Sequence, residues 1–275
     1  MPLTHEHEAS SSIILPSTGN PTENPASDGI YWTTASTALR VAYRSLVVLA
    51  LLCLTTFELL VRRLTASEAV VLAQRCARRI LRVAGTTVVI QGQPPRDAGL
   101  TVCNHRSYLD IVVLLSASPC TFLCKSEIRR WPLIGRCARQ MGAVFVDRSN
   151  KACRAESRMR VAFALANGVR LAAFPEGTTT RGPGMRETRP GLFLAAEQHG
   201  FNVLPTVIEY ADPDDAWVDD DTLLRHCVTW LAKPRSVVTL RFGAPLSPSP
   251  GEPGLHQRAE SWMRHALREI NAHRH

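Results

Sequence analysis

The chain has 275 residues, of which 45% are hydrophobic and 20% are charged, and this is enough to bury one substantial core with appended segments. Its 32 basic and 24 acidic residues give a formal net charge of +8, which favours anionic partners such as phospholipid surfaces, phosphorylated substrates, coenzyme A or an acidic carrier protein. Nucleic acid is discounted as a partner, because no zinc-ligand spacing or RNA-binding signature accompanies the charge and aromatic residues make up only 6%.

The N-terminal region divides into a polar tail and an apolar stretch. Residues 1–29 are rich in Ser, Thr, Pro, Asn and Gly without periodicity, and we expect them to be disordered. Thr33 to Arg63 follows, with an uncharged centre of 13 residues from Ser45 to Phe57. A spanning helix needs about 20 apolar residues, although long flanking side chains can extend a shorter core. We therefore expect membrane insertion, shallow or spanning, with a buried soluble helix as the alternative.

Ser67 to Ala84 is predicted to form an amphipathic helix. Its apolar residues share one side of a helical wheel, and the other side carries four arginines, namely Arg75, Arg78, Arg79 and Arg82. By itself the pattern is more typical of a helix packed on a sheet with a solvated basic face. Beside the apolar stretch it favours a helical membrane anchor over residues 30–85, because a basic amphipathic helix suits an anionic bilayer.

From residue 86 onward, short apolar runs alternate with helical stretches. Strands are predicted over residues 86–91, 100–103, 121–124, 143–146, 169–174, 203–208 and 237–242, and helices over residues 111–116, 132–141, 151–167, 191–199 and 255–273. Short apolar runs are typical of strands that are covered on both faces. The predicted fold class is therefore α/β, with a mainly parallel or mixed sheet and helices on both faces, preceded by the N-terminal helical membrane anchor.

No metal site is expected. Residues 211–221 are acidic, but the Gly and the closing Glu of a calcium loop are missing, so a solvated loop is predicted. The eight cysteines include no CxxC pair, and several lie in apolar runs. We expect reduced thiols in a domain that faces the cytosol.

Two polar clusters follow strand-like runs, at positions where α/β proteins build their sites. Asn104 to Asp110 follows the predicted strand at 100–103, and Phe174 to Thr178 ends the one at 169–174. We expect both clusters to lie on one rim of one sheet.

The spacing in the first cluster predicts a general base. His105 and Asp110 are five residues apart, and such positions diverge by roughly 140° on a continuous helix. We therefore expect His105 in the bend before a helix that begins at Ser107, so that the Asp110 carboxylate folds back onto one ring nitrogen and the other accepts a proton. The alternatives are a structural histidine and an Asp110 that completes a capping box with Ser107.

Four ordered blocks together resemble the glycerolipid acyltransferases related to 1-acylglycerol-3-phosphate acyltransferase, a family that includes lyso-ornithine lipid acyltransferases. The blocks are His105-x4-Asp110, Gly142 to Arg148, Phe174 to Thr178 and Val203 to Pro205, and Lys125 to Ile128 with Pro132 and Gly135 resembles a further segment. The likeness covers roughly residues 85–210. It implies an α/β acyltransferase domain over residues 86–275, behind the two-helix anchor that the family often carries.

The resemblance implies that His105 deprotonates an acceptor hydroxyl, which attacks an acyl thioester, while Asp110 orients the ring. Acyl-CoA or acyl carrier protein would be the co-substrate, with no cofactor and no metal, on the cytoplasmic side of a membrane. The residues expected to bind the acceptor are Lys125, Arg148, Glu176, Gly177, Thr178 and Arg181.

The acceptor head group is less well defined. The family commonly continues the third block with a basic residue directly after Glu-Gly-Thr, whereas here Thr179 and Thr180 precede Arg181. Lysophosphatidate, which would give phosphatidic acid, is the leading acceptor, and a lyso-ornithine lipid is the alternative.

Two other function classes stay open. A lysophospholipid hydrolase would use the same His105 with water or with Ser107, although no GxSxG motif is present in the chain. A non-catalytic lipid-binding protein would need the anchor and the basic surface but not the pairing of His105 with Asp110.

Overall fold

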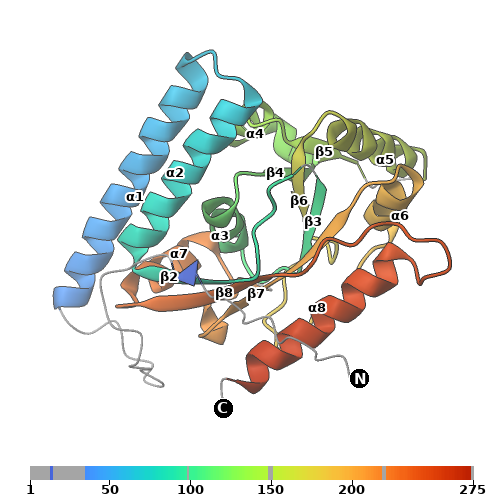
Figure 1. The fold of residues 1–275 in the computed structure, drawn as a ribbon. Coiled ribbons are helices and arrows are strands. Elements are labelled where there is room, and N and C mark those ends of the chain that lie inside the picture. The colour runs from blue at the N-terminus through green and yellow to red at the C-terminus, as the bar shows by residue number, and fades with distance from the viewer. Residues whose placement is uncertain (1–12, 15–34, 98, 148–150, 219–220, 274–275) are drawn as a thin grey trace.

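The structure is a computed structural model that describes residues 13–14, 35–97, 99–147, 151–218 and 221–273. Within these residues an eight-stranded mixed sheet forms the centre, and helices cover both of its faces, as the sequence predicts (Figure 1). The strands are β1 (Ile13–Ile14), β2 (Thr86–Gln91), β3 (Gly99–Cys103), β4 (Thr121–Lys125), β5 (Val144–Val146), β6 (Arg170–Ala173), β7 (Val203–Tyr210) and β8 (Ser236–Phe242).

The strand order is β1-β2-β8-β7-β3-β6-β4-β5. β1 is antiparallel to β2 and β7 is antiparallel to β8, whereas the other neighbours are parallel. The helices are α1 (Ala35–Val61), α2 (Ala66–Ala84), α3 (Leu109–Ala117), η1 (Ser126–Arg130), α4 (Ile134–Gln140), α5 (Lys151–Ala166), α6 (Gly191–Gln198), η2 (Pro213–Asp215), α7 (Leu223–Ala232) and α8 (Leu255–Ala272), where η marks a 3-10 helix. Every strand predicted from residue 86 onward is present.

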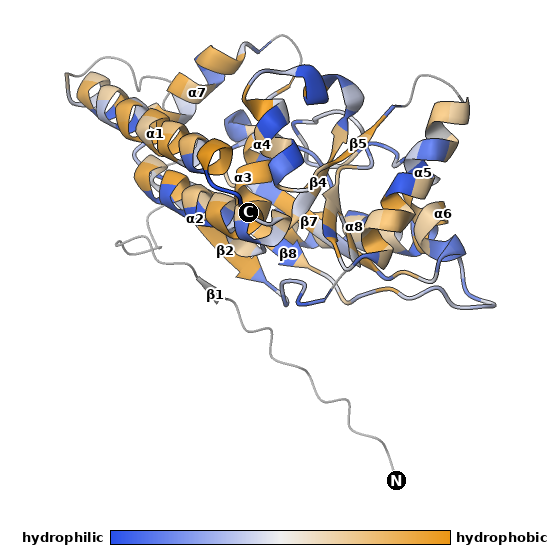
Figure 2. Ribbon diagram, turned by 90° about the horizontal axis from the view of Figure 1, so that it is seen from above, coloured by the Kyte–Doolittle hydropathy of each residue, from blue (hydrophilic) through white to orange (hydrophobic). Residues whose placement is uncertain are grey.

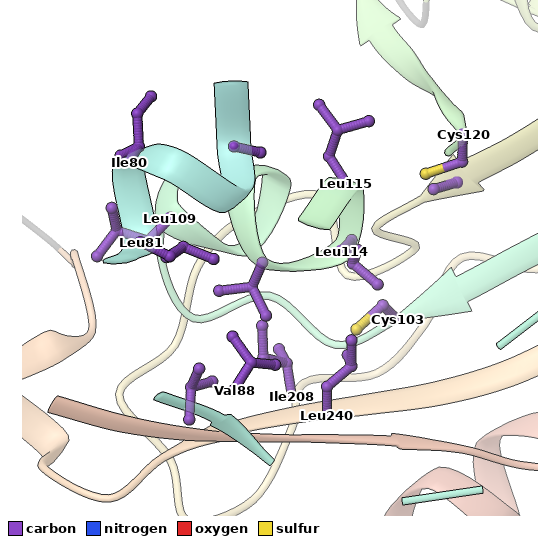
Figure 3. Close-up of a cluster of buried hydrophobic side chains, with 14 of the residues drawn as sticks. Ile80, Leu81, Val88, Cys103, Leu109, Leu114, Leu115, Cys120, Ile208 and Leu240 are labelled. Carbon is purple, nitrogen blue, oxygen red and sulfur yellow. The ribbon is translucent and has the colours of Figure 1, made fainter. Parts of the chain in front are cut away.

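Two hydrophobic clusters lie on opposite faces of the sheet, because successive side chains of a strand point to opposite sides. In β7, Ile208 belongs to the cluster with α2 and α3, whereas Val207 belongs to the cluster with α5, α6 and α8. Figure 3 shows the first cluster, in which Leu81 of α2 and Leu114 of α3 lie over Ile208 and Leu240 of the sheet. This packing fixes α3, and with it the first polar cluster, on the sheet.

α1 is an exposed apolar helix. It has 27 residues and, among the described helices, is the one that is long and apolar enough to cross a membrane, with a mean hydropathy of 2.0 over 18 residues (Figure 2). One side contacts α2 and α7, while Leu46, Leu49 and Phe57 are 59 to 68% exposed. The flanking Arg44 does not extend the apolar core toward a membrane surface, because its guanidinium donates to the Lys233 carbonyl at 2.6 Å. These exposed apolar side chains on the outward side of α1 support the predicted membrane contact.

α2 is part of the protein core. It begins with a capping box between Thr65 and Glu68, and its apolar residues, such as Ala77 and Leu81, are buried against α3 and the sheet. The prediction that this face lies in a bilayer is wrong, because the protein itself covers it. The four arginines on the opposite face are exposed.

The acidic segment at residues 211–221 is not simply a solvated loop. Asp215 is 1% exposed, and its Oδ1 accepts a hydrogen bond from the Lys233 ammonium at 2.7 Å. Burial raises the pKa of Asp215 to about 6, and the Lys233 charge opposes this rise. The Trp217 backbone N–H donates to the Arg106 carbonyl at 2.9 Å, so the segment packs beside the first polar cluster.

Besides the short 3-10 helices η1 and η2, one strand and one α-helix were not predicted. Ile13 and Ile14 pair with β2 as β1, so the expectation of disorder is wrong for these two residues, while the rest of the predicted tail at 1–29 lies outside the described residues. α7 follows the acidic segment and is capped by Thr222, whose hydroxyl accepts a hydrogen bond from the Arg225 backbone. That cap is the sequence signal that could have revealed the helix.

Candidate active site

His105 lies in the bend between β3 and α3, at the carboxyl end of β3. Its Nδ1 lies 2.8 Å from Oδ2 of Asp110, in the first turn of α3, so the contact predicted from their spacing is present. α3 begins at Leu109 rather than at Ser107. The His105 side chain is 19% exposed and that of Asp110 is fully buried, so the imidazole connects a buried carboxylate with the surface.

The Asp110 carboxylate accepts hydrogen bonds from groups on both sides. Besides the imidazole, Oδ2 meets the backbone N–H groups of Arg106 at 2.6 Å and Ser107 at 3.0 Å, and Oδ1 meets the Tyr210 hydroxyl at 2.8 Å. These donors stabilise the negative charge and fix the direction of the carboxylate. Asp110 therefore anchors the start of the helix and contacts His105 at the same time, so the capping and pairing interpretations are both correct in part.

The second nitrogen of His105 is the one available for chemistry. An ionised carboxylate can only accept hydrogen bonds, so Nδ1 is assigned the proton and Nε2 carries the lone pair of the neutral ring. The ring stacks on Phe174, with centroids 4.1 Å apart and planes 14° from parallel. A basic nitrogen held in one orientation at a partly open surface is suited to general-base chemistry.

Three consecutive residues of β7 hold this bend. The Ile208 backbone N–H donates to Oδ1 of Asn104 at 2.8 Å, and Nδ2 of Asn104 donates to the Ile208 carbonyl at 2.9 Å. Oε2 of Glu209 accepts from Nε and Nη2 of Arg106, at 2.9 and 2.6 Å. Tyr210 follows and reaches the buried carboxylate described above. β7 therefore helps to hold the bend that carries the imidazole.

Arg106 also holds the loop that follows the second polar cluster. Its Nη1 donates to Thr180 Oγ1 and to the Gly184 carbonyl, both at 2.7 Å, and the residue is 1% exposed. Sequence reasoning missed Arg106, Glu209 and Tyr210 as site residues. The available signal was a carboxylate and a phenol at the end of an otherwise apolar strand.

Glu176 joins two loops through backbone contacts. Oε1 accepts from the His105 N–H at 2.8 Å, and Oε2 accepts from the Arg186 N–H at 2.7 Å. Burial raises the pKa of Glu176, and the two N–H donors and the Arg106 charge oppose the rise. Its observed contacts position the bend, and its expected role in holding the acceptor stays a prediction.

The turn after Glu176 leads back to the backbone of His105. Gly177 has a φ of +76°, a conformation that favours glycine, and its N–H donates to the Phe174 carbonyl at 3.2 Å. Thr178 is exposed, and the Thr180 N–H donates to the His105 carbonyl at 2.9 Å. The two polar clusters therefore meet at one rim of the sheet, as expected.

The predicted cationic residues are placed differently from one another. Lys125 is exposed at the end of β4, and Arg148 lies outside the described residues. Arg181 directly follows the turn that contacts the His105 backbone, and its guanidinium pairs with Asp214 at 2.9 Å and lies 3.9 Å from Asp221. A surface cation is therefore present beside the site, but two carboxylates already face it.

A metal site needs a cluster of donor side chains. Among the residues that the structure describes, no group of three or more His, Cys, Asp or Glu side chains could hold a metal ion. The imidazole of His105 contacts the Asp110 carboxylate, which orients the ring.

Comparison with known proteins identifies relatives of this chain. A family model described as Acyltransferase matches residues 81–209. The chain is 34% identical over 244 residues to a lyso-ornithine lipid O-acyltransferase of Pseudomonas aeruginosa, which covers 83% of this chain and 94% of that protein. It is 32% identical over 113 residues to a 1-acyl-sn-glycerol-3-phosphate acyltransferase of Neisseria gonorrhoeae, and the matched region covers 41% of this chain and 44% of that protein.

A solved structure shares the fold. The crystal structure of the 1-acyl-sn-glycerophosphate (LPA) acyltransferase PlsC from Thermotoga maritima matches with a TM-score of 0.64, over 86% of this chain and 97% of that one, at 20% identity. The chain belongs to the acyltransferase family, and the family predicted from its sequence blocks is confirmed.

Proposed function

We propose that this protein transfers a fatty acyl chain from a thioester donor to the free hydroxyl of a lysolipid, with His105 as the general base. The observation that carries the proposal is the 2.8 Å contact between Nδ1 of His105 and the buried Asp110 carboxylate. This contact leaves Nε2 free to take a proton and stabilises the imidazolium that results.

The reaction needs one base and no covalent enzyme intermediate. Nε2 of His105 removes the proton of the acceptor hydroxyl as its oxygen attacks the thioester carbonyl. The C–S bond then breaks. The imidazolium gives its proton to the sulfur, so that the donor leaves as a thiol. General-base help of this kind is worth roughly 10² to 10⁴ in rate. Acyl-CoA or acyl carrier protein supplies the thioester, and no resident cofactor takes part.

Of the two candidate acceptors, we favour a lyso-ornithine lipid. The likeness to the Pseudomonas aeruginosa protein extends over nearly its whole length. An ornithine head group carries a carboxylate and an ammonium, and the Arg181 guanidinium with Asp214 and Asp221 beside it offers a partner for each. A lysophosphatidate head group carries no cation for Asp214 and Asp221, so the two carboxylates would repel its phosphate.

Lysophosphatidate, which the sequence blocks favour, is the second candidate. The relative from Neisseria gonorrhoeae supports it, and the Arg181 guanidinium remains 49% exposed beside the turn. A hydrolase with a serine nucleophile is disfavoured because Ser107, the serine nearest to His105 in the chain, is completely buried and accepts a hydrogen bond from the Leu109 backbone.

We place the enzyme on the cytoplasmic side of a membrane, attached through α1. The exposed apolar surface of α1 supports the attachment, and its length and composition allow either a spanning or a shallow position. None of the eight cysteines, all of which lie within the described residues, forms a disulfide, which fits a reducing compartment.

The acceptor panel is the experiment that tests the proposal. Purified full-length protein is incubated with an acyl donor, as acyl-CoA or acyl carrier protein, and either lyso-ornithine lipid or lysophosphatidate, and the lipids are separated. We expect acyl chains to appear on the lyso-ornithine lipid. Transfer to lysophosphatidate alone would reverse the order of the acceptors, and release of free fatty acid without any acylated lipid would contradict acyl transfer itself.

A further inference from the structure

A cavity lies at the edge of the sheet, away from His105. It has a volume of about 680 Å³, within the range of small-molecule sites, and lies between η1, α4, β5 and α5. β5 is separated from β3 by β4 and β6 in the strand order, and neither His105 nor Asp110 lines the cavity. This edge groove is therefore distinct from the candidate active site.

The lining of the edge groove is largely apolar. Val144 and Phe145 of β5 contribute to it, together with Met159 and Phe163 of α5. Met159 and Phe163 are 70% and 74% exposed and lie four residues apart, so they share one face of the helix. Large exposed apolar side chains around a concave surface mark a place where a partner with apolar parts binds.

Cations line the same groove. Arg160 pairs with Glu156 at 2.7 Å, but within the described parts of the chain no carboxylate forms an ion pair with Arg129 or Arg139. Instead, Nη1 of Arg139 donates to the Arg129 carbonyl at 2.6 Å, which holds α4 beside η1. Two guanidinium groups without a protein counter-charge fit an anionic group on a ligand.

An exposed apolar tip adjoins this cationic end. Trp131, Leu133 and Ile134, directly after η1, are 53%, 59% and 57% exposed. Leu133 has a φ of +61°, a backbone conformation that is rare for residues other than glycine and marks functional segments when it persists. A tryptophan and aliphatic residues next to arginines are typical of a segment that enters the surface of an anionic bilayer.

We propose that the edge groove binds an anionic phospholipid of the bilayer. The lipid phosphate lies between Arg129 and Arg139, one acyl chain follows Met159 and Phe163, and the tip around Trp131 enters the bilayer surface. The two guanidinium groups favour an anionic ligand over a neutral one, and the apolar lining favours a ligand with an acyl chain over a small inorganic anion. The protein thereby gains a lipid contact besides α1, one that does not depend on acyl transfer.

Fluorescence quenching tests this site directly. The full-length protein in neutral detergent micelles is titrated with phosphatidylglycerol that carries brominated acyl chains, because bromine quenches tryptophan on contact. We expect the quenching to be saturable. The Trp131→Phe variant should lack the part of the quenching that comes from Trp131. Brominated phosphatidylcholine should need at least a fivefold higher concentration for the same effect.

Two double variants separate the groove from general electrostatic attraction. Arg129→Gln with Arg139→Gln should raise the phosphatidylglycerol concentration at half-quenching about tenfold, because cations near an anionic lipid surface each contribute to binding. Arg225→Gln with Arg268→Gln removes the same charge from exposed positions on α7 and α8 and should change it less than twofold.

Three outcomes would overturn the assignment. One is equal quenching by the anionic and the zwitterionic lipid, and another is an equal effect of the two double variants. The third is displacement of the brominated lipid by coenzyme A, which would show that the groove binds the acyl donor. None of these readouts requires turnover, so the test of the lipid site is independent of the test of the proposed reaction.

Discussion

The His105 bend and the Arg181 loop are neighbours that are built in opposite ways. Asn104, Arg106 and Asp110 are at most 1% exposed, and each is bonded to β7. Arg181 and Asp214 are 49% and 71% exposed in their side chains, and their pairing lies at the surface. The difference indicates that the core fixes the position of the His105 bend, while the loop that we propose to face the acceptor head group is solvated.

The energetic consequence follows from burial. Removing one partner of a buried ion pair leaves an uncompensated charge, whereas exposed pairs are screened by water and contribute about 0 to 1 kcal/mol. Changes at the bend should therefore affect folding and turnover, and changes at the Arg181 loop should affect the choice and affinity of the acceptor.

The largest effect is expected for Glu209→Gln. This change keeps the side-chain volume but leaves the Arg106 guanidinium buried without its counter-charge, which costs about 3 to 5 kcal/mol in comparable pairs. Denaturant unfolding in detergent measures the loss, and activity should fall with it. Glu58→Gln breaks an exposed pair with Arg62 and should cost less than about 0.5 kcal/mol. Equal losses would show that the bend is not held more firmly than the surface.

Tyr210→Phe should have a smaller and more specific effect. It removes one donor to the Asp110 carboxylate, and hydrogen bonds to charged groups are worth about 1.5 to 3 kcal/mol. We expect kcat to fall about tenfold while KM changes little, because the acceptor contacts are untouched. Tyr108→Phe also loses a hydroxyl, one that contacts His226 and Cys227, and should reduce kcat less than threefold. If both variants lose kcat equally, Tyr210 does not act through Asp110.

Arg181→Gln should have the smallest effect. An exposed charge contributes about 1 kcal/mol, so KM for the lysolipid should rise roughly three- to fivefold with kcat nearly unchanged. Arg225→Gln serves as the control, since it removes an exposed arginine of α7. A loss confined to kcat would contradict the assignment of Arg181 to acceptor binding.

Local patterns in the sequence predict much of the fold and the central contact of the site. The apolar runs locate the strands, and the five-residue separation of His105 and Asp110 places both side chains in one bend. The support from β7 was not predictable in this way, because Arg106 and Glu209 are 103 residues apart and no local pattern joins them. Only the packed sheet brings such residues together.

α2 shows a second limit of sequence patterns. An amphipathic helix has the same periodicity whether a bilayer or a protein core covers its apolar face. The arginines on its exposed face favoured the bilayer, but α3 and the sheet cover the apolar face. By contrast, α1 has exposed apolar residues along its outward side, and for this helix the structure agrees with the sequence.

The central claim is that Nε2 of His105 takes the proton of the acceptor hydroxyl. The most direct measurement is the rate of acyl transfer by purified His105→Ala, with thermal unfolding and flotation on phospholipid vesicles recorded for the same preparation. We predict that transfer falls by about 10² to 10⁴ while the unfolding temperature and vesicle binding stay close to those of the unmodified protein. Transfer within a few-fold of the unmodified rate would contradict the claim.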